Sequence, residues 1–570
     1  MYAGKTSTVK IPSVGEHEKI ITLPNGYVYY ATEAHWDKEK GRMVDNRVGI
    51  GKIDPEHPGM MFPGKRFNEF FEQSTADNES SSLFEPYCPK KRKEAGILDI
   101  MLSYAPFAVL EKTAELSGML TALKQAMPRW WKEILAVAAH AVIAEQSTAQ
   151  SFRGWAFDTW CGLKKPPSDS TISRMYSDIA ASYGCIEQFF ELYLKEFHSL
   201  FPCSRERVVA FDSTNQVSES TGQEKARRGK AKTGEKLPII NTAMYVDEET
   251  GISLWYEHFD GNVLDKTQTP YSMEKAVRLG FKKLFAMMDR GYYSEANARR
   301  ATQLGVGFGM MMPETVSLVS EIIAKWKDKI RLNEERYIRE EDIYGVQTEV
   351  ILPSGDRYYA YVYYDDRAAT DERNSIHGQV NFYMAEAEKR IRYTDKMRDF
   401  FAKRAIIVTK ESNPQTRQNF QLSVDHQMVQ QAYDESGFFV ILSNRLMKAS
   451  SMITIARNRD CAEKSFCDVK KHFLLSRTYS HSDATYCGKM ITAFIALILL
   501  QSFRWFERQL LASKSSETVA TLIAELRKYK ILQKKDGSWM PVYAMNKKQK
   551  ALLAAVHLTE EEIEAKVRVL

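Results

Sequence analysis

The sequence predicts a mixed α/β protein built from several domains. Its 570 residues exceed one compact core, because a domain holds about 150 residues. Hydrophobic residues make up 44% and charged residues 27%, an ordinary globular composition that can fill several cores. Strand-like and helix-like patterns alternate through the middle of the chain, which favours strands and helices that share one sheet.

The first two regions of the chain differ in their residue patterns. Residues 1–95 cluster β-forming residues between Gly, Pro and Asn, and they predict a small β-rich N-terminal domain. Residues 96–204 carry apolar residues at three- and four-residue spacing and predict a helical domain. Within it, KKPPSDSTISRMYSDIAASYG combines Pro, a Ser/Asp cap and an amphipathic helix. Such a helix enters a DNA groove in helix-turn-helix proteins, but more often it is one more packed helix.

The next segments predict an interrupted core. Residues 205–313 read as three strands, a helix, a strand, a helix and a strand, which predicts the first part of a core with a mixed sheet. Residues 314–436 alternate strands such as DRYYAYVYYDD with charged helical stretches. We therefore expect a β-rich insertion there.

The core is expected to resume over residues 437–512. A strand is followed by a basic helix from about Met452 to His472 and then by an apolar helix. The most apolar stretch, Met490 to Leu500, is shorter than the roughly 20 residues that cross a bilayer, so it predicts a buried core helix. Residues 513–570 predict a small C-terminal appendage.

Charge and cysteine usage narrow the class of protein. The formal charge of +6 is only mildly basic, but eight Lys or Arg stand against three acids between Arg445 and Ser480. This cluster suits a polyanion, although a solvated helix face has the same composition. The seven cysteines are scattered without a C-x-x-C pair, which excludes a disulfide framework or zinc knuckle. With no apolar segment of a secretory signal at the N-terminus, we expect a soluble cytosolic protein.

Three acids occupy distinctive places in the predicted core. Asp212 lies in the first strand, Asp289 ends the fourth, and Glu463 lies on the basic helix after the insertion. Carboxylates so placed can converge on hard cations, and two such ions roughly 3.5–4 Å apart can cleave a phosphodiester. Taken singly, each Asp also fits a helix cap or a turn.

The basic helix adds a pattern of its own. At 100° per residue, Arg459, Glu463 and Lys470 share one face. An acid between two cations suits a metal-bound phosphate, with the acid on the metal and the cations on phosphate oxygens. An i,i+4 ion pair on a surface helix is the simpler alternative.

Together these residues resemble insertion-sequence DDE transposases whose third motif is Y-x(2)-R-x(3)-E-x(6)-K. Arg459, Glu463 and Lys470 match that spacing, and A-F-D-S-T and D-R-G-Y-Y resemble the contexts of the first two acids. The stretch G-N-V-L-D-K-T, residues 261–267, is also similar to a family stretch. The resemblance covers roughly residues 205–510. One position departs, because Ala456 stands where the family has Tyr.

The resemblance implies a ribonuclease-H-like core with a β-rich insertion between the second and third acids. It implies a DNA transposase that cuts transposon ends and joins the 3′-hydroxyl to target DNA. Asp212, Asp289 and Glu463 would bind two Mg²⁺ ions, for which Mn²⁺ could substitute. Arg459 and Lys470 would contact DNA phosphates. Accessory residues would be Lys464, Lys471 and Arg290.

The same resemblance implies partners and leaves two alternatives. The partners are double-stranded DNA, as terminal inverted repeats and target, and a second copy of the chain on paired ends. The helical and small N-terminal domains would bind the ends, and the protein would act on the nucleoid in the cytoplasm of a bacterial or archaeal cell. A ribonuclease-H-like nuclease without strand transfer would keep the same acids. A catalytically silent DNA-binding derivative would be expected to lose one, and none is lost.

Aromatic residues crowd one strand of the predicted insertion. Base stacking on such side chains is physically reasonable, although alternate aromatics on a strand are more often core. The residues are Tyr358, Tyr359, Tyr361, Tyr363 and Tyr364, with Trp326 nearby in sequence.

Overall fold

The structure is a computed structural model of the 570-residue chain. It describes residues 8–14, 19–37, 42–64, 66–71, 100–146, 148–182, 184–232, 234–281, 283–390, 392–410, 420–471, 477–511 and 517–570. At 32–37, 42–46, 68–69, 410, 469–471 and 510–511 it describes the backbone alone. By its internal contacts the chain divides into two compact units, Met1–Ala95 and Gly96–Leu570.

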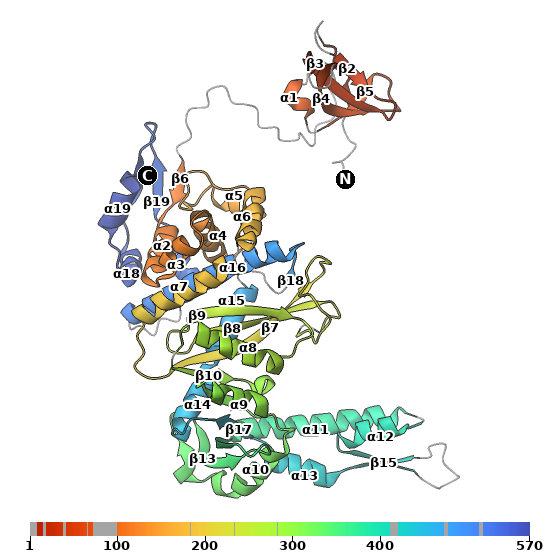
Figure 1. Cartoon of the computed structure of the whole chain (residues 1–570), viewed down its shortest axis with the longest axis vertical. Helices are drawn as coiled ribbons and strands as arrows, with labels where there is room; N and C mark the ends of the chain where they lie inside the picture. Colours follow the sequence, from red (N-terminus) through yellow and green to blue (C-terminus); the bar gives the residue numbers. More distant parts are fainter. Residues whose placement is uncertain are drawn as a thin grey trace. The chain divides into compact units, whose positions relative to one another are not determined.

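The first unit is a five-stranded antiparallel sheet in the order β1-β5-β4-β3-β2 (Figure 1). Its small core contains Val28, Tyr30, Ile50, Met61 and Phe67. The elements are β1 (Val9–Lys10), β2 (Lys19–Thr22), β3 (Tyr27–Asp37), β4 (Arg42–Ile53), β5 (Met60–Pro63) and α1 (Phe67–Phe70).

The second unit begins with helices that share a hydrophobic core with the sheet that follows. Apolar residues at helical spacing form them, and Ser168 caps the amphipathic helix α6 by accepting from the backbone N–H of Thr171. The elements are β6 (Met101–Ser103), α2 (Ala105–Leu116), α3 (Met119–Ala126), α4 (Trp131–Ala144), α5 (Ala149–Trp155), α6 (Asp169–Ala181) and α7 (Cys185–Leu200).

The predicted order of three strands, helix, strand, helix and strand is confirmed. The strands lie in the order β9-β8-β7-β10-β11 within a ten-stranded sheet. Strands β7, β10 and β11 are parallel, whereas β8 and β9 are antiparallel to their neighbours. This is the expected ribonuclease-H-like core. Its elements are β7 (Arg207–Ser218), β8 (Ile239–Asp247), β9 (Ser253–Asp260), α8 (Asp265–Arg278), β10 (Leu284–Met288), η1 (Arg290–Tyr292), α9 (Glu295–Gln303) and β11 (Gly307–Met311).

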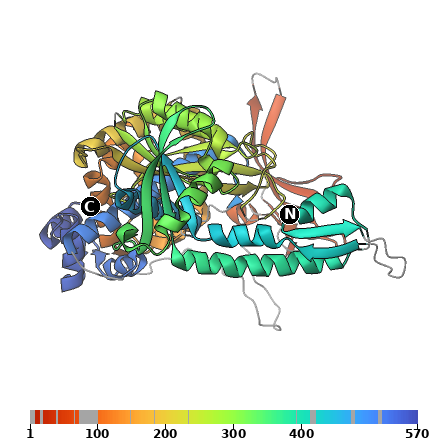
Figure 2. The same ribbon diagram turned by 90° about the horizontal axis from the view of Figure 1, so that it is seen from below.

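The insertion extends this same sheet. Strands β12, β13 and β14 continue it beyond β17, which pairs antiparallel with β11. Helices α11 and α13 run out beside the hairpin β15–β16, as Figure 2 shows from below. The elements are α10 (Ser317–Ile330), η2 (Glu334–Arg336), β12 (Tyr337–Ile338), β13 (Ile343–Ile351), β14 (Arg357–Tyr364), α11 (Asp366–Glu388), α12 (Asp395–Ala402), β15 (Ile406–Lys410), β16 (Phe420–Val424), α13 (His426–Glu435) and β17 (Phe438–Ser443).

The predicted continuous helix from Met452 to His472 is instead two helices that meet at Arg459. These are α14 (Ala449–Asn458) and α15 (Asp460–Lys471). At the junction the backbone N–H of Ala462 donates to the carbonyl of Arg459, three residues back, a tighter turn than the α-helical one. His472 lies outside the described residues.

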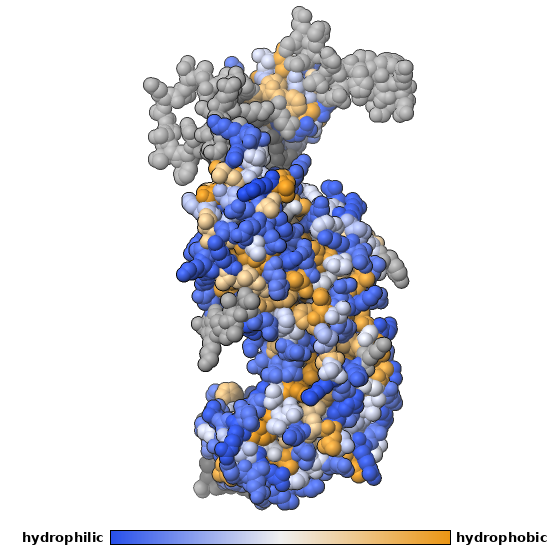
Figure 3. Space-filling view, turned by 90° about the vertical axis from the view of Figure 1, so that its left-hand side faces the viewer, coloured by the Kyte–Doolittle hydropathy of each residue, from blue (hydrophilic) through white to orange (hydrophobic). Residues whose placement is uncertain are grey.

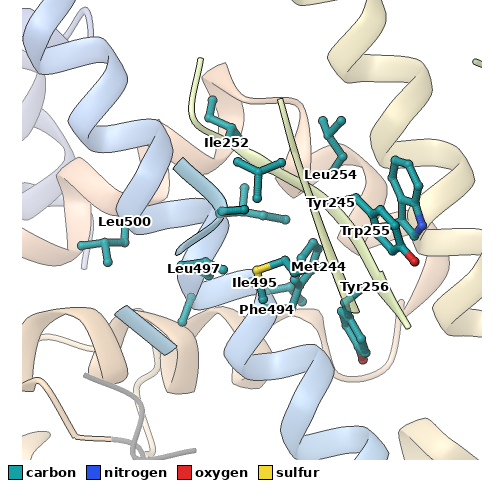
Figure 4. Packing of buried hydrophobic residues seen from close by; sticks show 14 of the residues in the cluster. Met244, Tyr245, Ile252, Leu254, Trp255, Tyr256, Phe494, Ile495, Leu497 and Leu500 are labelled. Carbon is teal, nitrogen blue, oxygen red and sulfur yellow. The ribbon is translucent and has the colours of Figure 1, made fainter. Parts of the chain in front are cut away.

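Helix α16 (Asp483–Leu511) is the central support of the second unit. It packs against α2, α4 and α6, and Met490 to Leu500 are all buried, which confirms the predicted core helix. Figure 4 shows Phe494 and Leu497 of α16 among residues of β8 and β9. Among the described helices, α16 is the one long and apolar enough to cross a membrane, but 89% of its most apolar window is buried.

The chain ends in a small group of elements beside the helices. Strand β18 pairs with β7, and β19 pairs with β6 from the start of the unit. The elements are β18 (Arg477–Thr478), α17 (Val519–Leu526), β19 (Lys530–Gln533), β20 (Trp539–Pro541), α18 (Lys547–Ala555) and α19 (Glu560–Arg568).

On the face drawn in Figure 3, hydrophobic residues are scattered among hydrophilic ones.

The contact of α16 with α6 depends on Gly488. A Cβ there would collide with the backbone of Tyr176, which cannot move aside as a flexible side chain can. We expect Gly488→Ala to lose about 1–3 kcal/mol of stability to overpacking, more than the helix gains from Ala. Gly378→Ala in α11 is the matched control, since nothing lies within 4 Å of its Cβ, and it should gain about 0.5–1 kcal/mol. Denaturant unfolding of both proteins measures this, and equal effects would contradict the packing argument.

Candidate active site

Strand pairing brings the first two acids together. Strand β10 pairs parallel with β7, and Met288 stands opposite Phe211 in the register. The next residue on each strand is an acid, so Asp212 and Asp289 occupy adjacent positions on adjacent strands. Strand β7 continues past Asp212, whereas β10 ends at Met288 and the chain turns into η1.

Backbone N–H groups hold both carboxylates. The Oδ1 atom of Asp212 accepts from the N–H of Ser213 at 2.8 Å. Asp289 caps η1, with its Oδ1 accepting from the N–H of Arg290 at 2.7 Å. These bonds help to fix where the carboxylates lie, and for Asp289 the bond is the one expected of an acid that follows a strand and caps a turn.

Arg459 links the third acid to the second. Its Nη2 lies 3.0 Å from Oε1 of Glu463, and its Nη1 lies 3.4 Å from Oδ2 of Asp289. The arginine side chain is only 13% exposed, against 45% for Asp289 and 55% for Glu463. One largely buried guanidinium at the α14–α15 junction therefore joins acids that are 174 positions apart in sequence, from 289 to 463.

The electrostatics of Asp212 place it in the same group. Burial raises the pKa of Asp212, while Lys232, the Ser213 N–H and Arg459 lower it and Asp289 raises it further. Asp212 thus feels both Arg459 and Asp289, so the three predicted acids converge around one cation. A carboxylate held in this way gains from any additional positive charge nearby.

A fourth carboxylate lies here that was not among the predicted site residues. Asp265 begins α8, and its Oδ2 would lie 3.8 Å from a Cβ on Gly291. Burial raises the pKa of Asp265, Ser213 and Lys232 lower it, and Asp289 raises it. The sequence signal for Asp265 is the stretch G-N-V-L-D-K-T, which resembles a family stretch but by itself assigns no role to its Asp.

Lys232 was also missed. It belongs to the connection between β7 and β8, and its Nζ donates to the carbonyl of Ser213, next to Asp212. Six Lys or Arg between residues 220 and 236 were the available signal.

The other predicted site residues lie in different surroundings. Arg290 pairs with Glu314 at 2.6 Å, outside the group of acids. Lys464 lines a separate cavity of about 420 Å³ with Glu248, Arg504 and others, none of them among the three acids. Lys470 and Lys471 lie on α15, but their side chains are outside the described residues.

Ala456 and the tyrosines of β14 belong to the core. Ala456 is half-buried against a cluster that includes Met452, Tyr361 and Tyr363. The hydroxyls of Tyr361 and Tyr363 donate to backbone carbonyls of Arg445 and Ala449. These two fully buried rings are structural and are not available for base stacking.

The donor set fits a hard divalent cation. As they stand, no three His, Cys, Asp or Glu side chains among the described residues are close enough to hold a metal ion. At this site the Arg459 guanidinium contacts both Asp289 and Glu463. Carboxylate oxygens are nevertheless the ligands that Mg²⁺ prefers. A cation could take over the charge that the guanidinium now neutralises.

Comparison with known proteins identifies the family. The family model described as "Transposase DDE domain" matches residues 204–499, just over half of the chain. The chain belongs to this transposase family. The match contains all three acids of the candidate site.

Solved structures and curated proteins give less information about the chain than the family model does. A solved piggyBac transposase, in a cryo-EM synaptic complex with hairpin DNA, is similar to this transposase at a TM-score of 0.34 and 8% identity. The likeness covers 74% of this chain and 78% of that chain, and it is too low to support a conclusion about the site. No curated protein matches the transposase.

The raised pKa of Asp212 predicts how stability varies with pH. A raised folded-state pKa means that the ionised carboxylate opposes folding at neutral pH, and that this cost vanishes below the ordinary value of 3.8. We expect Asp212→Asn to raise the thermal unfolding midpoint at pH 7, with the gain shrinking as the pH falls toward about 4 and absent at lower pH.

Asp356 is the matched control because Arg299 lowers its pKa, so its carboxylate supports folding at neutral pH. Asp356→Asn should lower the midpoint at pH 7. If Asp212→Asn were instead destabilising at pH 7, the attraction of Lys232 and Arg459 would outweigh the cost of burial.

Proposed function

We propose that this transposase cuts the ends of a DNA element and joins the freed 3′-hydroxyl to target DNA. The observation that carries the proposal is the convergence of Asp212, Asp289 and Glu463 around Arg459. Two acids from neighbouring parallel strands and one from a helix after a long insertion meet at one place. Core packing does not require this meeting, since Asp289 and Glu463 are about half exposed.

Asp212, Asp289 and Glu463 would hold two Mg²⁺ ions, or Mn²⁺ in their place. When bound, such a pair activates the attacking oxygen and stabilises the leaving oxygen of an in-line phosphodiester displacement. Asp265 lies near enough to join these ligands or to orient them.

The chain's own cations prepare and complete the site. Arg459 neutralises Asp289 and Glu463 when no other cation is present. Released from them, its planar guanidinium can bind two phosphate oxygens at once. Lys232 lowers the pKa of Asp212 and donates to the backbone carbonyl of Ser213 beside it. Lys470 would add a phosphate contact, with Lys464, Lys471 and Arg290 as accessory cations.

The partners follow from the reaction. The substrate is double-stranded DNA, both as the element's ends and as target, and the helices of residues 96–204 would bind the ends. Two ends must be cut and joined together, so a homodimer on paired ends is proposed, acting on the nucleoid in the cytoplasm.

Amide variants of the three acids test the proposed chemistry. Asp212→Asn, Asp289→Asn and Glu463→Gln should each abolish cleavage of duplexes taken from the two flanks of the protein's own gene, while binding of these duplexes persists. Because the three acids act as one site, the triple variant should be no worse than each single variant. The assay is strand cleavage and joining to a supercoiled plasmid in Mg²⁺.

Asp460→Asn is the control for the acids. It changes an exposed acid on the same helix that lines the separate cavity, so its rate should equal that of the wild type. If a single variant cut DNA at the wild-type rate, the acid it replaces would not belong to the catalytic site. Cleavage without joined products would favour a nuclease, and binding without cleavage a silent derivative.

A further inference from the structure

A strongly basic connection lies next to the candidate site. Residues 220–236, here called the basic loop, join β7 to β8 and carry six Lys or Arg against two Glu. Figure 1 shows β18 beside the ends of β7 and β8 from which this loop leaves. The cations are Lys225, Arg227, Arg228, Lys230, Lys232 and Lys236.

Backbone contacts fix the loop in place. Arg227 exchanges both main-chain hydrogen bonds with Ile239, at 3.1 and 2.8 Å. Gly229 and Gly261 pack backbone to backbone, because a Cβ on Gly229 would collide with the carbonyl of Gly261. A loop held this closely presents its side chains in a defined position.

Asn215 anchors the loop to β7, the strand that carries Asp212. This buried side chain of β7 donates to the carbonyl of Lys230 at 3.2 Å and accepts from the N–H of Lys232 at 3.1 Å. Asn215 is three positions after Asp212, and Lys232 reaches Ser213 between them. The basic loop is therefore bonded to β7 within three positions of Asp212.

The outer cations of the loop are not neutralised by the protein. Arg227, Arg228 and Lys230 are exposed and form no ion pair with the residues that the structure describes. Two neighbouring acids are engaged elsewhere, since Glu219 just before the loop and Glu235 within it both pair with Arg477 of β18. Exposed arginines held close together, without carboxylate partners, suit the phosphates of a nucleic acid backbone.

We infer that the basic loop binds the DNA backbone beside the phosphodiester that the acids cleave. The inference rests on the proposed function and adds a specific surface to it. Arg227, Arg228 and Lys230 contact phosphates flanking the reacting one, while Lys232 stays with the acids. Because these contacts are to phosphates, they add affinity without reading the base sequence.

The salt dependence of DNA binding tests the loop. Each phosphate contact contributes about 0.9 to the slope of log affinity against log salt concentration. R227A/R228A should therefore flatten the slope by about 1.8, equally for duplexes from the gene's flanks and for a scrambled duplex. R227K/R228K keeps both charges and should stay near the wild-type slope.

K534A/K535A is the matched control, since it removes two adjacent exposed cations from the β19–β20 turn. It should leave the slope unchanged, and circular dichroism confirms that each variant is folded. A wild-type slope in R227A/R228A, or an equal loss in K534A/K535A, would overturn the role of the loop. If the loop's role were overturned while the wild type still cut DNA, the proposed function would stand. If instead the amide variants of the three acids cut DNA, the proposed function would fail, and the salt slope of R227A/R228A would be unaffected.

Discussion

The parallel pairing of β10 with β7 is the constraint on which the rest of the site depends. Its register sets Asp212 beside Asp289, and the turn after Met288 releases Asp289 to accept from Arg290. The long insertion returns through β17 into the same sheet and so delivers α14 and α15. Arg459 at their junction then reaches Asp289, and Glu463 follows one helical turn later.

This arrangement places like charges together at a cost to stability. Burial and Asp289 raise the pKa values of Asp212 and Asp265, whereas Lys232 lowers both and Arg459 also lowers that of Asp212. Lys232 comes from the basic loop and Arg459 from a helix junction, and Ser213 of β7 contributes its backbone N–H to Asp212 and its hydroxyl to Asp265. Carboxylates grouped in this way suit the proposed metal cations, and the basic loop beside them suits the phosphates of DNA.

Much of this architecture could be predicted from the sequence, because strand order, helix periodicity and acid spacing are local patterns. The core strands, the buried helix around Met490–Leu500 and the third motif were all visible. What was missed depends on pairing between distant segments. No local pattern in the sequence indicates that β14 pairs with β17, that Arg459 contacts Asp289 or that Lys232 contacts Ser213. The break at Arg459 interrupts an otherwise helical sequence pattern and was likewise not visible.

The central claim is that Asp212, Asp289 and Glu463 form one metal site whose place Arg459 holds. Anomalous scattering from crystals of the protein bound to end DNA and grown with Mn²⁺ tests this most directly. The account predicts Mn²⁺ coordinated by the three carboxylates, with the Arg459 guanidinium moved from Asp289 and Glu463 onto a DNA phosphate. Mn²⁺ bound elsewhere, with Arg459 still joining the two acids, would contradict it.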